Sequence, residues 1–318
     1  MIFFSSTAPS VGIEVTATSL RGVRLAAKGR QRVVAARAFV DLPSGLVTGT
    51  FSRPNVADGA LFREHLARLC TNLGAGQDRV ALALPDAAAR VHLMAFETLP
   101  RKESELRDII VWRLKRDNLL PFEPEEARVV YQIMGGEKAK GEIPVLASIM
   151  RRDVLEQYVS LCQEASLEPM TVDIASFQGA NFFHDEMRRH VPGSETRALV
   201  QCEEKRASLM VFDGDILVFF RSKETGAGTE GAADAVMATL QSSLHYYNEQ
   251  RKNEKPIAAY CIAGHEKRMD WCGWLRNEPG VRLISLDAEK CVEREAGVSE
   301  DRSGEYCAAT GAALGNRG

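Results

Sequence analysis

Residues 11–25 have the sequence VGIEVTATSLRGVRL, which predicts two short apolar strands joined by a turn of small hydroxyl residues. One carboxylate, Glu14, lies inside the first strand. The turn and the second strand add groups that could donate hydrogen bonds to a phosphate: Thr16, Thr18, Ser19 and Arg21. The stretch therefore raises two alternatives, a hairpin that binds phosphate and a hairpin that only looks like one.

The predicted elements around this hairpin occur in the same order twice. The first half has three strand-like runs, a helical pattern and another apolar strand, at 12–16, 22–27, 32–40, 60–74 and 79–85. The second half has the same five elements at 198–203, 207–214, 215–222, 232–253 and 256–264. This repeated order predicts an α/β fold made of two related half-domains that face each other.

The residues between the two halves predict an inserted subdomain. It has three strand-like runs and two helical patterns, the latter at 101–119 and 151–169. Three strands against two helices would make a small α+β unit of about 80 residues, enough to close a core of its own. We therefore divide the chain into the first half (1–85), the insertion (86–166), the closing strand and helix of the first half (167–195) and the second half (196–318).

Composition narrows the class of protein. The 318 residues carry a formal net charge of −3, which argues against a dedicated nucleic-acid-binding protein because such proteins have a strongly basic face. The seven cysteines form no CxxC pair and the six histidines lie at no ligand spacing from them, so we predict no metal site and a reducing compartment. The start, MIFFSSTAPS, lacks the basic residues of a signal peptide, although residues 1–4 could touch a membrane surface. No apolar run approaches the roughly 18–20 residues that span a bilayer. We expect a cytoplasmic protein.

Five segments, in this order, resemble the PilM family of type IV pilus assembly proteins, relatives of the cell-division protein FtsA in the actin-like ATPase superfamily. The first is GIEVTATSLR, beside a family pattern like GIDIGSSSVK. The others are LPRKESELRDIIVWRLKRDNLLPFEPEEARVVYQ, LASIMRRDVLEQYVSLCQEASLEPMTVDIASFQGANFF, LQSSLHYYNEQ and YCAATGAALG. The resemblance covers nearly the whole chain. It implies two actin-like (ribonuclease H-like) halves, each of βββαβα order, with the inserted subdomain attached to the first half.

The resemblance also implies a role as a cytoplasmic scaffold of a type IV pilus or type II secretion platform, peripheral at the cytoplasmic face of the inner membrane. Its partner would be a single-pass membrane protein resembling PilN, which supplies a short N-terminal cytoplasmic peptide with an Asn-Leu-Leu-Pro type core. The family groove for this peptide runs between the first half and the insertion. An exposed strand edge there would come from 90–96 or 127–133, and its candidate residues are Val91, Leu93, Val129 and Tyr131. Alternatively, both runs could be interior strands.

An actin-like fold would hold ATP and Mg²⁺ between its halves, and three positions decide whether this chain can do so. At the first, Glu14-Val15-Thr16 replaces the family's Asp-x-Gly, and Arg21 replaces the usual lysine. At the second, neutral Gln201 replaces the metal-facing aspartate. Glu203 and Glu204 follow where phosphates should lie, and Lys205 and Arg206 could offset their charge only by turning inward. At the third, Gly264 could form the turn beside the adenosine.

We therefore expect a vestigial nucleotide site, with Glu14, Thr16, Thr18, Ser19, Arg21, Gln201 and Gly264 as its remaining residues. On this interpretation the chain has no catalytic residues and needs no cofactor. The alternative is an active actin-like ATPase that uses ATP and Mg²⁺ with Glu14 as the metal carboxylate. Such a protein could also polymerise, and self-association stays open.

Overall fold

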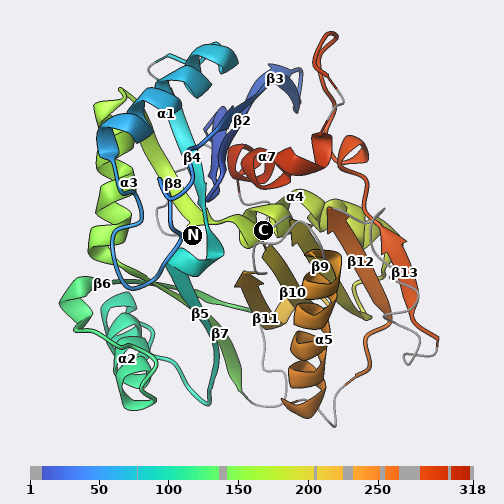
Figure 1. Ribbon diagram of the computed structural model, residues 1–318. Coiled ribbons are helices and arrows are strands. Elements are labelled where there is room, and N and C mark those ends of the chain that lie inside the picture. Colours follow the sequence, from blue (N-terminus) through green and yellow to red (C-terminus); the bar gives the residue numbers. More distant parts are fainter. Residues whose placement is uncertain are drawn as a thin grey trace.

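The computed structural model describes residues 9–76, 78–135, 142–203, 206–224, 232–250, 255–264, 280–299 and 302–315. These residues form two five-stranded sheets, one three-stranded sheet and the helices that cover them (Figure 1). The expectations for residues 1–4 and for Glu204 and Lys205 lie outside the described residues.

The sheet of the first half has the order β3-β2-β1-β4-β8. Its strands are β1 (Val11–Val15), β2 (Ser19–Lys28), β3 (Gln31–Asp41), β4 (Arg79–Leu84) and β8 (Glu168–Ile174). β1 pairs antiparallel with β2 and parallel with β4, and all five of its residues are buried. A central strand covered on both faces favours apolar residues throughout. The buried carboxylate of Glu14 is an exception, and its contacts are described with the candidate site.

The sheet of the second half has the order β11-β10-β9-β12-β13. Its strands are β9 (Thr196–Glu203), β10 (Arg206–Asp213), β11 (Ile216–Glu224), β12 (Ala259–Gly264) and β13 (Arg282–Ser285). β9 takes the place of β1, because it too has an antiparallel neighbour, β10, and a parallel neighbour, β12. The two related α/β halves predicted from the repeated order are confirmed, in the arrangement that the family resemblance implied.

Two helices pack between the five-stranded sheets, α4 (Ala175–His190) and the short α7 (Cys307–Leu314) (Figure 1). Their approach requires glycine at two positions. A Cβ atom on Gly12 would lie 1.9 Å from the Ala309 carbonyl oxygen, and one on Gly311 would lie 1.9 Å from the Gln178 carbonyl oxygen. The small residues of the segment CAATGAAL thus let α7 pack closely against both β1 and α4.

The inserted subdomain consists of a three-stranded antiparallel sheet and one helix. Its elements are β5 (Ala89–Phe96), α2 (Glu103–Arg116), β6 (Ala127–Ile133) and β7 (Ile143–Arg151). β7 is the central strand and β5 and β6 are the two edges. The buried residues of α2, Leu106, Ile110 and Leu114, close the subdomain's core on one face of this sheet.

The second helix expected in the insertion belongs to the first half instead. α3 (Arg152–Glu164) turns its buried residues, among them Leu155 and Tyr158, into the core formed by the first sheet and α1 (Gly59–Leu73). The subdomain sheet ends at Arg151. The reason is geometric, because the face of the small sheet opposite α2 is already covered by parts of both halves. On the second sheet, α5 (Ala232–Gln250) occupies the position equivalent to α1.

Candidate functional site

The β1–β2 turn is closed by its own threonine. The Thr16 hydroxyl oxygen accepts hydrogen bonds from the Ser19 N–H at 2.9 Å and from the Thr18 N–H at 3.2 Å. Among the described residues, positive φ outside glycine occurs at Asn118, Ser166 and Arg302, so Thr16 has an ordinary backbone conformation. A phosphate loop needs its N–H groups directed outward. Here two of them are directed at a side chain within the turn.

Glu14 is almost fully buried, and its neighbour across the hairpin is Arg21. The Arg21 Nη1 atom lies 3.6 Å from Glu14 Oε2. Arg21 also donates a hydrogen bond of 3.2 Å to the carbonyl oxygen of Glu305 in the short helix η5 (Ser303–Tyr306). Opposed residues of an antiparallel pair bring their side chains together. The strand register therefore supplies Glu14 with its counter-charge.

Gln201, on β9, is used in packing the second half against α4. Its Nε2 donates a 2.8 Å hydrogen bond to the Ser176 carbonyl oxygen in the first turn of α4. A Cβ atom on Gly179 would lie 2.1 Å from Gln201 Oε1, so the absence of a side chain at position 179 makes room for the amide. The side chain of Glu203, expected to oppose phosphates, lies outside the described residues.

A buried carboxylate, Asp86, forms the centre of the polar contacts in the cleft. It lies in η1 (Asp86–Ala88), the short 3₁₀ turn between β4 and β5. Asp86 Oδ1 lies 2.8 Å from Arg206 Nη1 on β10 and accepts a 2.9 Å hydrogen bond from the Ser176 N–H. Asp86 Oδ2 accepts hydrogen bonds from the hydroxyls of Ser176 and of Ser222 on β11, the latter at 2.5 Å. Sequence reasoning missed Asp86, since its partners lie 90 to 136 residues away along the chain.

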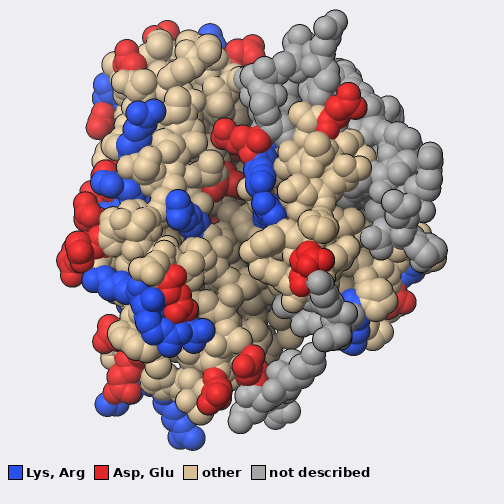
Figure 2. Space-filling model, turned by 60° about the horizontal axis from the view of Figure 1, so that its bottom comes forward, with Lys and Arg blue, Asp and Glu red and all other residues tan. Residues whose placement is uncertain are grey.

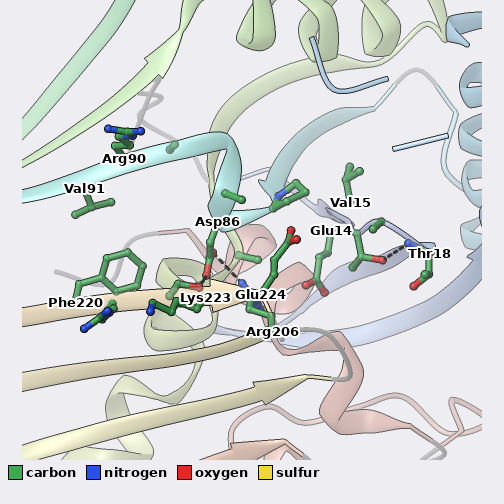
Figure 3. Close-up of a pocket in the computed structure, with 18 of the residues that line it drawn as sticks. Glu14, Val15, Thr18, Asp86, Arg90, Val91, Arg206, Phe220, Lys223 and Glu224 are labelled. Atoms are coloured by element: carbon green, nitrogen blue, oxygen red, sulfur yellow. Dashed lines mark hydrogen bonds and ion pairs between the residues drawn. The ribbon is translucent and has the colours of Figure 1, made fainter. Parts of the chain in front are cut away.

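These contacts line a cavity of about 320 Å³ between the two halves and the subdomain (Figure 3). Its walls come from the β1–β2 turn, from η1 with the start of β5, and from the end of β11. Figure 3 shows Val91 and Phe220 projecting into it from β5 and β11. Of the residues expected at a nucleotide site, the cavity brings together Glu14, Thr16, Thr18 and Arg21. Ser19, Gln201 and Gly264 do not line this cavity.

The position expected for adenosine is narrow. Gly264 ends β12 and pairs with Cys202 on β9. The cavity formed by described residues at these strand ends and η5, lined by Gln201, Ala263 and Glu305 among others, measures about 20 Å³. That volume holds roughly one water molecule, whereas small-molecule pockets measure about 300 Å³ or more.

The four residues expected in a partner groove fall on two faces of the subdomain sheet. Val91 and Val129 oppose Ser148 and Ile149 of β7, and neighbouring residues of one strand point to opposite faces. Val129 and Tyr131 therefore pack in the core beneath α2. Val91 and Leu93 share the other face, and Leu93 packs against the same core cluster as Phe220 of the second half. β5 and β6 are nevertheless both edge strands of the sheet.

His92 also lines the cavity, from β5. Its Nε2 atom is buried and has no hydrogen-bond partner among the described residues. Burial, together with the positive charge of Arg90, lowers the pKa of His92. We therefore treat the imidazole as neutral at physiological pH.

Charge on the visible surface is mixed. Figure 2 shows basic and acidic side chains of the described residues interspersed over the face turned forward, with no broad field of one sign. No cluster of three or more potential metal-ligating His, Cys, Asp or Glu side chains occurs within the described ranges. Among the described helices, none combines the length and apolar character needed to cross a bilayer.

The two equivalent sheets, the helices between them and the cleft at their meeting point define a protein with an actin-like fold. Residues 12–254, well over half of the chain, match the family described as type IV pilus assembly protein PilM. The chain belongs to this family.

One solved structure supports the same fold. A structure described as a PilM-PilN type IV pilus biogenesis complex is similar with a TM-score of 0.79 and 18% identity, covering 96% of this chain and 97% of that chain. A protein of unknown function with an actin-like ATPase fold, from Bacteroides thetaiotaomicron, has a TM-score of 0.49 and 11% identity over 88% and 91% of the two chains. A comparison with curated proteins by sequence gave no match.

Proposed function

We propose that this chain is a scaffold of the type IV pilus assembly platform that binds a short cytoplasmic peptide of a PilN-like, single-pass inner-membrane protein. Membership of the PilM family supports the pilus role, and the similar structure is a complex of PilM with PilN. The chain would work in the cytoplasm, held at the inner face of the membrane through this partner. The family match favours a pilus platform over a type II secretion platform.

We place the peptide in the cavity beside β5. β5 is an edge strand of the subdomain sheet, and Val91 and Phe220 offer apolar side chains across the cavity. An edge strand can pair with the backbone of an extended peptide while pockets select its side chains. A volume of about 320 Å³ suits a few side chains of such a peptide, including the leucines of an Asn-Leu-Leu-Pro core.

We further propose that the cleft does not hold ATP and that the chain is not an enzyme. The observation that carries this proposal is the 2.8 Å ion pair of Arg206 with Asp86, which engages the arginine of the second hairpin. Glu14 is likewise paired with Arg21, and the Gln201 amide is bonded to α4. The described residues thus do not fit a magnesium-bound nucleotide, because the groups that would bind it are engaged with one another.

A peptide titration tests the binding role. A fluorescently labelled peptide with an Asn-Leu-Leu-Pro core, taken from the start of the cognate partner, should raise its anisotropy on addition of the protein, and a scrambled peptide should not. Val91→Glu should weaken binding because it adds a charge to the cavity wall. Gln132→Glu adds the same charge at an exposed position of β6 and should leave binding unchanged. Absence of binding to the wild-type chain, or an equal loss in both variants, would overturn the proposal.

A further inference from the structure

Asp86 lies at a junction of the chain. β4 of the first half ends at Leu84, η1 begins at Asp86, and β5 of the subdomain begins at Ala89. A displacement of the subdomain about this connection must therefore move the backbone that carries the Asp86 carboxylate. The position of Asp86 is thereby tied to the position of β5, which forms one wall of the cavity.

The same carboxylate is bound to both halves. Ser176, at the start of α4, donates to it from its N–H and its hydroxyl. Arg206 of β10 and Ser222 of β11 reach it from the second half. Only 4% of the Asp86 side chain and 12% of the Arg206 side chain are exposed, so the pair is largely withdrawn from water. Charge-assisted hydrogen bonds are strongest under such conditions.

Apolar contacts join the same bodies on the other side of the cavity. Leu93 and Leu146 of the subdomain share a core cluster with Ile216 and Phe220 of the second half. Phe220 also stacks against Phe177 of α4, with ring centroids 5.0 Å apart. The cavity therefore exists in this form only while the subdomain and the second half remain together.

We propose that Asp86 acts as a latch that holds the second half against the hinge of the subdomain and so couples closure of the cleft to binding of the peptide. The proposal rests on the proposed function for the identity of the ligand. A ligand that contacts both Val91 and Phe220 binds the closed arrangement better than an open one, and it must shift the equilibrium toward closure. Asp86 is a positioning residue in this scheme, because it acts through the placement of β5 and β11.

Hydrogen exchange of the peptide-free protein tests the latch without reference to any ligand. Asp86→Asn keeps the shape of the side chain and removes its charge, and should speed amide exchange in both β5 and β11. Arg206→Gln should speed exchange in the same strands. The matched control is Arg79→Gln, which removes an exposed ion pair with Glu168 on the first sheet. This control should leave amide exchange in both strands unchanged.

Peptide affinity tests the coupling. Asp86→Asn and Arg206→Gln should each weaken binding of the Asn-Leu-Leu-Pro peptide by about tenfold, which is within the usual range of coupling between sites. The double variant should bind no more weakly than either single variant, because the two residues act as one pair. If each residue instead contacted the peptide independently, the losses of affinity in the two single variants would multiply in the double variant.

The outcomes separate the two proposals. Unchanged exchange in β5 and β11 in Asp86→Asn would overturn the latch, whatever the peptide does. Faster exchange with unchanged peptide affinity would overturn the coupling. If the wild-type chain binds no peptide, the proposed function fails, while exchange in the peptide-free protein still decides whether Asp86 holds the cleft closed.

Discussion

The Arg206 guanidinium lies 2.8 Å from the Asp86 carboxylate, and this ion pair joins the second half of the molecule to the hinge of the inserted subdomain. In an actin-like cleft, the β9–β10 hairpin would be one of the two that bind phosphate, and Arg206 is the first residue of its second strand. Here its arginine is neutralised by a carboxylate of the chain itself. We propose that such internal charges hold the cleft together without a nucleotide.

Removing the Asp86 carboxylate should destabilise the protein. Asp86→Ala removes the carboxylate that pairs with the largely buried Arg206, and breaking a buried pair in this way costs about 3–5 kcal/mol of unfolding free energy. Urea denaturation measures the change. Glu168→Ala, which removes the exposed ion pair with Arg79, should cost at most about 1 kcal/mol. A loss for Asp86→Ala as small as that of the control would contradict the role of the pair.

Enlarging Gly311 should disturb the contact between α7 and α4. Alanine is more favourable than glycine in a helix by about 1 kcal/mol, so helix propensity alone predicts a more stable protein. The new Cβ would lie 1.9 Å from the Gln178 carbonyl oxygen, a backbone atom that cannot rotate away. We expect Gly311→Ala to lower the unfolding free energy by about 1–3 kcal/mol. Gly304→Ala, where no atom lies within 4 Å of the new methyl, should change it by less than about 0.5 kcal/mol.

His92 should make the protein less stable in mild acid. Burial and the charge of Arg90 lower the pKa of His92 in the folded state below its ordinary value of 6.5. Above pH 6.5 neither state binds the proton, so His92 adds no pH dependence to the stability. As the pH falls below 6.5, the unfolded chain binds a proton that the folded chain excludes, and stability declines by up to about 1.4 kcal/mol per pH unit until the folded pKa is reached.

The measurement is urea unfolding of the wild type and of His92→Gln at pH 7.5, 6.5 and 5.5. The difference in stability between the two proteins should shift in favour of the variant as the pH falls. Because other titrating groups are common to both, their contributions cancel in the comparison. A difference that stays constant with pH would show that His92 does not titrate below its ordinary pKa.

Sequence alone predicted the parts of this structure that depend on local pattern and order. The repeated strand and helix order gave the two halves, and the hairpin predicted at residues 11–25 is present as β1 and β2, although the register that places Glu14 opposite Arg21 was not predicted. It could not predict the contacts of Asp86, because three separate elements must fold before Ser176, Arg206 and Ser222 meet that carboxylate. Nothing in the local sequence around Asp86 encodes these partners.

The subdomain illustrates a second limit. An apolar strand pattern identified β5 and β6, but which residues share a face depends on the register each strand adopts against β7. That register sets Val91 and Val129 on opposite faces, so the candidate residues could not line one groove. The helix α3 packs on the first sheet and not in the expected subdomain, because the face of the small sheet opposite α2 is already covered by parts of both halves.

The central claim is that the cleft is closed by its own ion pairs and binds no nucleotide. Isothermal titration of ATP with Mg²⁺ into the wild-type chain tests it most directly. The account predicts no binding in the micromolar range, because Arg206, Arg21 and Gln201 already have partners within the protein. Micromolar binding of ATP with Mg²⁺ would contradict it and favour an actin-like ATPase.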